Sequence, residues 1–212
     1  MKTVVLVGGA SASGKSTFTS LLNSNVKGSI KYRRVQAFFD YAELKKISKE
    51  ETFKYVNSQN ADDWFLKVCQ TNDYVISDIH YAVQMDRNFK TDNIGANIYQ
   101  EYVPTISSSL INRLLDSDIR VIAVHMYCSN NTLLERAVIR NKEGKRELRA
   151  VSLKDVELQT TAERKEWINI SNISGVEVVE LDSELYSPLR LVEQFHKLTN
   201  QFCNKVLIKK KN

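Results

Sequence analysis

The chain has 212 residues, of which 42% are hydrophobic and 26% charged, values that are ordinary for one soluble globular domain. Seven glycines and two prolines exclude collagen-like and Pro/Gly-rich disordered chains, and no run approaches the roughly 18 apolar residues that span a bilayer. The three cysteines form no CxxC pair, which argues against a zinc site and a disulfide framework. The net charge of +5 suits an anionic partner such as a nucleotide and is compatible with nucleic acid.

The first apolar run, Val4–Val7, is too short for the apolar region of a signal peptide and is typical of a core strand. We therefore expect a cytoplasmic protein without a membrane partner, as a monomer or homodimer. Residues 1–212 contain no internal repeat or low-complexity linker and are predicted to form a single domain.

Short β-branched runs alternate with amphipathic segments along the chain, which predicts a mostly parallel sheet buried between helices. Ser152 with Asp155 resembles a capping box, and Ser187-Pro188 resembles a helix start with proline at the first position. The expected strands are Thr3–Val7, Arg34–Phe39, Tyr74–Ser77, Arg120–Tyr127 and Val176–Leu181.

Residues 9–16 read Gly-Ala-Ser-Ala-Ser-Gly-Lys-Ser, directly after the first predicted strand and before a helix. This is the Walker A pattern in its diagnostic context, where glycines let backbone amides approach phosphate oxygens at a helix N-terminus. In such a loop Lys15 reaches the β- and γ-phosphates, and the Ser16 hydroxyl binds Mg²⁺. We predict an α/β fold of the P-loop NTPase class that binds ATP and Mg²⁺: a three-layer sandwich with a five-stranded, mostly parallel sheet, helices on both faces and a small lid. The expected nucleotide-binding residues are Gly9, Ala10, Ser11, Ala12, Ser13, Gly14, Lys15, Ser16 and Thr17.

Two carboxylates follow predicted strands. Asp78 ends the buried run Asp73–Ser77, the position of a Walker B carboxylate that holds Mg²⁺; the alternative is a cap for the loop beyond. Asp40 follows the second predicted strand and is a candidate general base, or a group that holds the acceptor hydroxyl in line. As an N-cap for the next helix, Asp40 would be merely structural.

Arginines mark a candidate lid at about residues 136–150. Arg136 and Arg140 are spaced i, i+4 and share one face of a helix. Arginines there can neutralise charge on the transferred phosphoryl group, whereas the alternative is a solvated helix face.

The acceptor is expected to bind within about residues 40–102. His80 and Tyr81 follow Asp78 at the strand's carboxyl end, where open α/β sheets place their ligands; the alternative is a packed tyrosine and a surface histidine. Arg33 and Arg87 are candidate clamps for an anionic acceptor, because guanidinium groups match phosphate oxygens.

The order of phosphate loop, Asp40, Asp78 and arginine-bearing lid resembles the nucleoside and nucleotide kinases among P-loop proteins. Phe39-Asp40-Tyr41 is similar to the Asp-aromatic signature of uridine kinase-like enzymes, whose Asp acts on the acceptor hydroxyl. Asp78-Ile79 with the later arginines, and Val179–Asp182, are similar to guanylate kinase, but its Thr-Thr-Arg-x-Pro-Arg segment is missing. The resemblance implies an ATP-dependent kinase of a nucleoside, nucleotide or similar small acceptor. The candidate catalytic residues are then Lys15, Asp40, Arg136 and Arg140.

Two alternatives have weaker support. A regulatory GTPase would carry Asp-x-x-Gly after the third strand, whereas the chain has Asp78-Ile79-His80-Tyr81. A P-loop ATP-binding protein without transfer activity, or a kinase acting on nucleic acid, is compatible with the positive charge, but no basic stripe interleaved with aromatic residues indicates nucleic acid.

Overall fold

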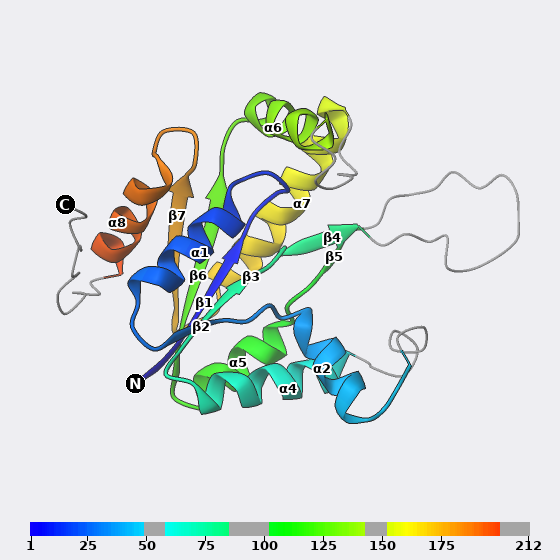
Figure 1. The fold of residues 1–212 in the computed structure, drawn as a ribbon, viewed down its shortest axis with the longest axis vertical. Coiled ribbons are helices and arrows are strands. Elements are labelled where there is room, and N and C mark those ends of the chain that lie inside the picture. The colour runs from blue at the N-terminus through cyan, green and yellow to red at the C-terminus, as the bar shows by residue number, and fades with distance from the viewer. Residues whose placement is uncertain (49–57, 85–101, 143–151, 200–212) are drawn as a thin grey trace, which may run out of the picture.

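A computed structural model describes residues 1–48, 58–84, 102–142 and 152–199. Five parallel strands form one sheet in the order β2-β3-β1-β6-β7, with helices on both faces (Figure 1). This confirms the predicted α/β sandwich. The strands of the sheet are β1 (Lys2–Gly8), β2 (Ser29–Lys31), β3 (Tyr74–Asp78), β6 (Ile119–Tyr127) and β7 (Val176–Asp182). The helices are α1 (Lys15–Asn25), α2 (Gln36–Leu44), α4 (Ser58–Thr71), α5 (Ser108–Asp116), α6 (Asn130–Lys142), α7 (Leu153–Ser171) and α8 (Pro188–Leu198).

Side chains of the central strand β1 alternate between two cores. Val4 and Leu6 pack toward α4, α5 and α7, whereas Val5 and Val7 pack toward α1 and α8. All four are fully buried, as expected for a parallel strand covered on both faces. The apolar run near the N-terminus is therefore the centre of the fold.

Strand register brings the carboxyl ends of three strands together. Val7 of β1 pairs with Asp78 of β3, and Gly8 of β1 pairs with His125 of β6. The phosphate loop leaves β1 at this edge, so it lies between the end of β3 and the end of β6. Open parallel sheets bind their ligands at such an edge.

The second predicted strand was wrong. Residues 34–39 do not form a strand; the strand is the preceding Ser29–Lys31, and Gln36–Leu44 is helix α2. Ala37 and Ala42 are buried in α2, which packs against α4. The apolar residues of this segment therefore belong to helix α2 and do not form a strand of the sheet.

The other four predicted strands agree with the structure to within one residue at each end. Ser152 and Asp155 form the predicted capping box at the start of α7, and Pro188 begins α8 after Ser187. A separate antiparallel pair, β4 (Ala82–Gln84) and β5 (Tyr102–Pro104), follows β3. No helix in the described ranges combines the length and the apolar character that a membrane span requires.

Candidate active site

Glycines of the phosphate loop have positive φ angles, and one of them leaves no room for a side chain. Gly9 has φ +139°, and a Cβ on it would lie 2.1 Å from the carbonyl oxygen of Met126 in β6. Gly14 has φ +92° and caps the N-terminus of α1. The loop therefore runs tightly against β6 and directs its next residues to the positive end of α1.

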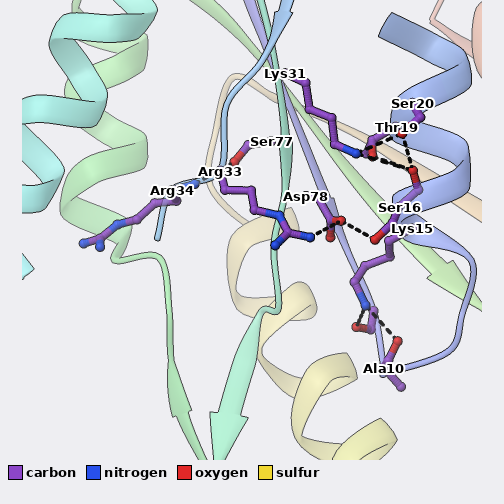
Figure 2. A network of polar contacts seen from close by, with 11 residues as sticks. Ala10, Lys15, Ser16, Thr19, Ser20, Lys31, Arg33, Arg34, Ser77 and Asp78 are labelled. Carbon is purple, nitrogen blue, oxygen red and sulfur yellow. Dashed lines mark hydrogen bonds and ion pairs between the residues drawn. The ribbon is translucent and has the colours of Figure 1, made fainter. Parts of the chain in front are cut away.

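Lys15 lies inside this loop. Its ammonium donates to the carbonyl oxygens of Gly9, at 2.7 Å, and Ala10, at 2.8 Å (Figure 2). Burial lowers the pKa of Lys15, while the negative charges of Glu163 and Asp78 act in the opposite direction. No carboxylate of the described residues contacts this ammonium group, so Lys15 is placed to meet an anionic ligand.

Ser16 and Asp78 meet at the mouth of the loop. The Ser16 hydroxyl donates to Asp78 Oδ2 at 2.7 Å, and Arg33 Nη2 lies 3.4 Å from the same oxygen (Figure 2). The Asp78 side chain is 7% exposed and that of Arg33 is 43% exposed. Sequence analysis had linked Ser16 to Asp78 through a shared metal, and the two lie in direct contact.

These residues fit Mg²⁺. The ion prefers oxygen ligands and binds through one or two protein groups together with phosphates and waters. Ser16 and Asp78 supply a hydroxyl and a carboxylate oxygen within reach of one another. The described residues contain no group of three or more His, Cys, Asp or Glu side chains that would form a closed metal cage.

The remaining loop residues frame the same site. Ser13 Oγ is buried and has no hydrogen-bond partner among the described residues, which suits a loop whose polar groups meet a ligand. Ala10 and Ala12 are buried beneath α6 and α7, while Thr17 is exposed at the first turn of α1. Ser11 accepts a hydrogen bond from Gln159 of α7 at 3.2 Å.

Both candidate lid arginines belong to α6. Arg136 donates to the Ser183 carbonyl at 2.9 Å and its hydroxyl at 3.0 Å, and lies 3.4 Å from the Ala12 carbonyl. It therefore connects the phosphate loop to the segment after β7. Arg140 is one turn further on, and its positive charge contributes to lowering the pKa of Lys15. Residues 143–151 of the predicted lid lie outside the described residues.

Asp40 is not at a strand end, which corrects the sequence prediction. It lies within α2, where its carboxylate accepts hydrogen bonds from Tyr32 Oη at 2.5 Å and Gln36 Nε2 at 2.8 Å. Burial raises the pKa of Tyr32, and the hydrogen bond to the Asp40 carboxylate raises it further. The two hydrogen bonds leave Asp40 tied to its own element and to the segment after β2.

Of the acceptor candidates, Arg33 lies at Asp78, whereas Arg87 is outside the described residues. Tyr81 is fully buried: its hydroxyl donates to the Val124 carbonyl at 2.9 Å and lies 3.2 Å from that of Leu6. Its ring fills the space beside Gly8, so Tyr81 is a core residue and does not face an acceptor. His80 is partly exposed and lies with Nδ1 2.6 Å from Glu163 Oε1.

Glu163 is a residue that sequence analysis missed. It lies on α7 with no exposed surface, and it lines a cavity of about 170 Å³ together with Ala10, His125 and Arg164. No motif surrounds it, and in the sequence it is one of several acidic residues on a long helix. Only the packing of α7 against the loop after β3 distinguishes it.

Comparisons with known proteins agree with this fold. No family model matches the sequence, and no curated protein matches it either. Among solved structures, the chain is similar to the tunicamycin resistance protein of Deinococcus radiodurans, with TM-score 0.56 and 13% identity over 94% of this chain and 96% of that chain. It is also similar to the YorR protein of Bacillus subtilis in complex with phosphorylated GDP, with TM-score 0.56 and 16% identity over 93% and 95% of the two chains. A third is deoxyadenosine kinase from M. mycoides, with TM-score 0.52 and 14% identity over 93% and 98%.

The chain has the fold of the P-loop kinases. The matches extend over nearly the full length of both chains, so the likeness is not confined to the phosphate loop. At identities of 13–16% the likeness establishes the P-loop kinase fold and leaves the acceptor to be inferred from the site.

Proposed function

We propose that this protein is an ATP-dependent phosphotransferase that uses Mg²⁺ and acts on a nucleoside, a nucleotide or a similar small molecule. The observation that carries the proposal is the 2.7 Å hydrogen bond between Ser16, directly after the phosphate-loop lysine, and Asp78 at the end of β3. It joins a Walker A hydroxyl to a strand-end carboxylate in a chain with the P-loop kinase fold.

In this proposal the chain binds the phosphates of ATP and holds the reacting groups in line. Loop amides and Lys15 receive the β- and γ-phosphates, while Ser16 and Asp78 hold Mg²⁺. When bound, the ion neutralises charge that develops on the phosphate oxygens during transfer. Arg140 and Arg33 add positive charge near Lys15, since both contribute to lowering its pKa.

The identity of the acceptor rests on fewer groups. Arg33 supports an anionic acceptor, because its guanidinium group is 43% exposed and its contact with Asp78 is long, at 3.4 Å. Such a group can turn from Asp78 to a phosphate oxygen at small cost.

Transfer of labelled phosphate from [γ-³²P]ATP to a panel of ribonucleosides, deoxynucleosides and their monophosphates tests the proposal. Lys15→Ala is expected to reduce transfer by at least about 100-fold, because it removes a cation from the developing charge. Lys27→Ala removes an exposed lysine just after α1 and serves as the matched control, with transfer unchanged.

Three results would count against the proposal or redirect it. Normal transfer by Lys15→Ala would show that the loop is not the donor site. Failure of the native protein to label any member of the panel, while binding ATP, would reject a small nucleoside or nucleotide acceptor. Labelling of oligonucleotide ends alone would assign the acceptor to nucleic acid.

A further inference from the structure

Glu163 is a buried carboxylate that faces the loop following Asp78. Its Oε2 accepts a hydrogen bond from the Tyr81 amide at 2.7 Å, and its Oε1 lies 2.6 Å from His80 Nδ1. None of Glu163 is exposed, whereas 34% of the His80 side chain is. A buried carboxylate is costly unless hydrogen bonds compensate for lost hydration, so these two contacts account for its orientation.

The contact determines which nitrogen of His80 is available. An ionised carboxylate only accepts hydrogen bonds, so the proton between the two groups belongs to Nδ1. In the neutral ring Nε2 is then the acceptor. Among the described residues Nε2 has no partner, and the ring is partly open to solvent. The His80–Glu163 pair thus directs a hydrogen-bond acceptor away from the core.

The pair lies at the phosphate loop. His80 is two residues beyond Asp78, at the carboxyl end of β3. One turn before Glu163 on α7, Gln159 donates to Ser11 of the loop at 3.2 Å. Glu163 is also the foremost of the charges that act on the pKa of Lys15. By contrast, the carboxylate of Asp40 is already bonded to Tyr32 and Gln36.

We propose that His80 Nε2 accepts a hydrogen bond, and then the proton, from the hydroxyl group of the acceptor, with Glu163 as the positioning residue that holds the ring in the required tautomer. This inference rests on the proposed phosphotransferase function. As the acceptor oxygen bonds to the γ-phosphorus, the bond from that phosphorus to the β,γ-bridging oxygen breaks, and ADP leaves with the electron pair. The hydroxyl proton passes to Nε2, and the resulting imidazolium remains paired with Glu163.

The pair narrows the class of acceptor. A hydroxyl group must lose a proton during transfer, so it benefits from a positioned base. A phosphate acceptor is already ionised near neutral pH and needs none. We therefore infer that the group receiving the phosphoryl is an alcohol hydroxyl and not the phosphate group of a nucleotide; Arg33 would then bind an anionic group elsewhere on the same acceptor.

The tautomer of His80 can be measured without any substrate. In ¹⁵N-labelled protein at pH 8, long-range ¹H–¹⁵N spectra identify the protonated ring nitrogen, and with three histidines His80→Gln assigns the signal. We expect Nδ1 to be protonated in the native protein. In Glu163→Gln the amide group can donate to Nδ1, so the proton should move to Nε2. A native ring protonated on Nε2 overturns the inference.

Kinetics on the nucleoside panel test the role in transfer. Glu163→Gln and His80→Gln should each lower kcat by at least about 100-fold while leaving KM for ATP within about twofold. The double variant should lose little more than either single variant, because the two residues act as a unit. Glu157→Gln, which changes an exposed carboxylate on the same helix, is the matched control with unchanged kcat.

The two proposals fail in different ways. Absence of transfer by the native protein rejects the phosphotransferase, and the inference with it. Native transfer that persists in both Glu163→Gln and His80→Gln rejects the inference alone. His80→Gln keeps the test open if Glu163→Gln does not fold, because the His80 ring is partly exposed.

Discussion

Neighbouring arginines after β2 have opposite environments. Arg33 points to Asp78 at the phosphate loop, whereas Arg34 points away from the site (Figure 2). Arg34 forms a buried ion pair with Asp62 of α4, in which both side chains are at most 10% exposed. The Arg34 amide also donates to Ser77 Oγ at 3.1 Å. The buried pair therefore anchors the segment from which Arg33 extends.

Removing one partner of this pair should be costly. Asp62→Ala removes the carboxylate that pairs with the buried Arg34 guanidinium. We expect the free energy of unfolding to fall by about 3–5 kcal/mol, because the charge stays buried without this partner. Urea denaturation measures the loss. Asp63→Ala is the matched control: Asp63 pairs with Arg113 at the surface, where a pair contributes about 1 kcal/mol or less. Equal losses in the two variants would contradict the prediction.

At the scale of elements, α7 connects the separate parts of the site. It begins at the Ser152–Asp155 capping box, contacts the phosphate loop through Gln159 and holds the loop after β3 through Glu163. Gln159 and Glu163 are one turn apart on the same face. The position of the whole helix therefore sets both contacts.

The capping box gives a test of how firmly α7 is held. Ser152→Ala removes the hydroxyl that accepts from the Asp155 amide, and we expect the free energy of unfolding to fall by about 1 kcal/mol. Ser171→Ala at the other end of α7 is the control, since its hydroxyl only bonds back to the Ile168 carbonyl and should matter less. Urea denaturation compares the two variants; a larger loss for Ser171→Ala would contradict the assignment.

Much of the fold could be predicted because β1, β3 and β6 carry apolar runs, β7 combines valines and a leucine with glutamates, and the phosphate loop has a strict spacing. The edge strand β2 could not, because Ser29–Lys31 is short and only partly buried, so it carries no strand pattern. The apolar run just after it was taken for a strand, although its buried alanines belong to a helix packed on α4. Asp40 was misplaced for the same reason.

The residues of the candidate site likewise divide into those that the sequence predicts and those that it does not. Ser16 and Asp78 could be paired in advance, since each belongs to a motif or a strand end. Glu163 lies 82 residues from the Tyr81 amide that it binds, and nothing local marks it. Contacts of that kind depend on how elements pack together, and a single sequence does not display them.

At the scale of the molecule, the free energy of unfolding should depend on pH through a buried histidine in the sheet. His125 lies on β6, 5% exposed and stacked on Trp167 with ring centroids 5.1 Å apart. Burial, with smaller contributions from the charges of Arg164 and Lys15, lowers the pKa of His125 to about 4. His125 therefore binds a proton near pH 6.5 in the unfolded chain, whereas in the folded chain it stays neutral until the pH approaches 4.

Stability should consequently fall as the pH drops from about 6.5 toward 4, because the unfolded state binds more protons in that window. His125→Phe removes this contribution. Between pH 7 and pH 5 the native protein should lose about 2 kcal/mol more free energy of unfolding than the variant. Urea denaturation at the two pH values measures the difference, and identical pH slopes would show that His125 does not contribute.

Four consecutive residues at the end of β3 each face a different part of the molecule. Asp78 meets Ser16, the Ile79 amide donates to the Val7 carbonyl at 2.9 Å, His80 meets Glu163, and Tyr81 fills the space beside Gly8. An insertion or deletion in this segment would displace all four contacts at once, whereas a substitution would disturb only the contact of the residue that changes. Among related sequences, residues 78–81 should therefore keep their length even where their side chains change.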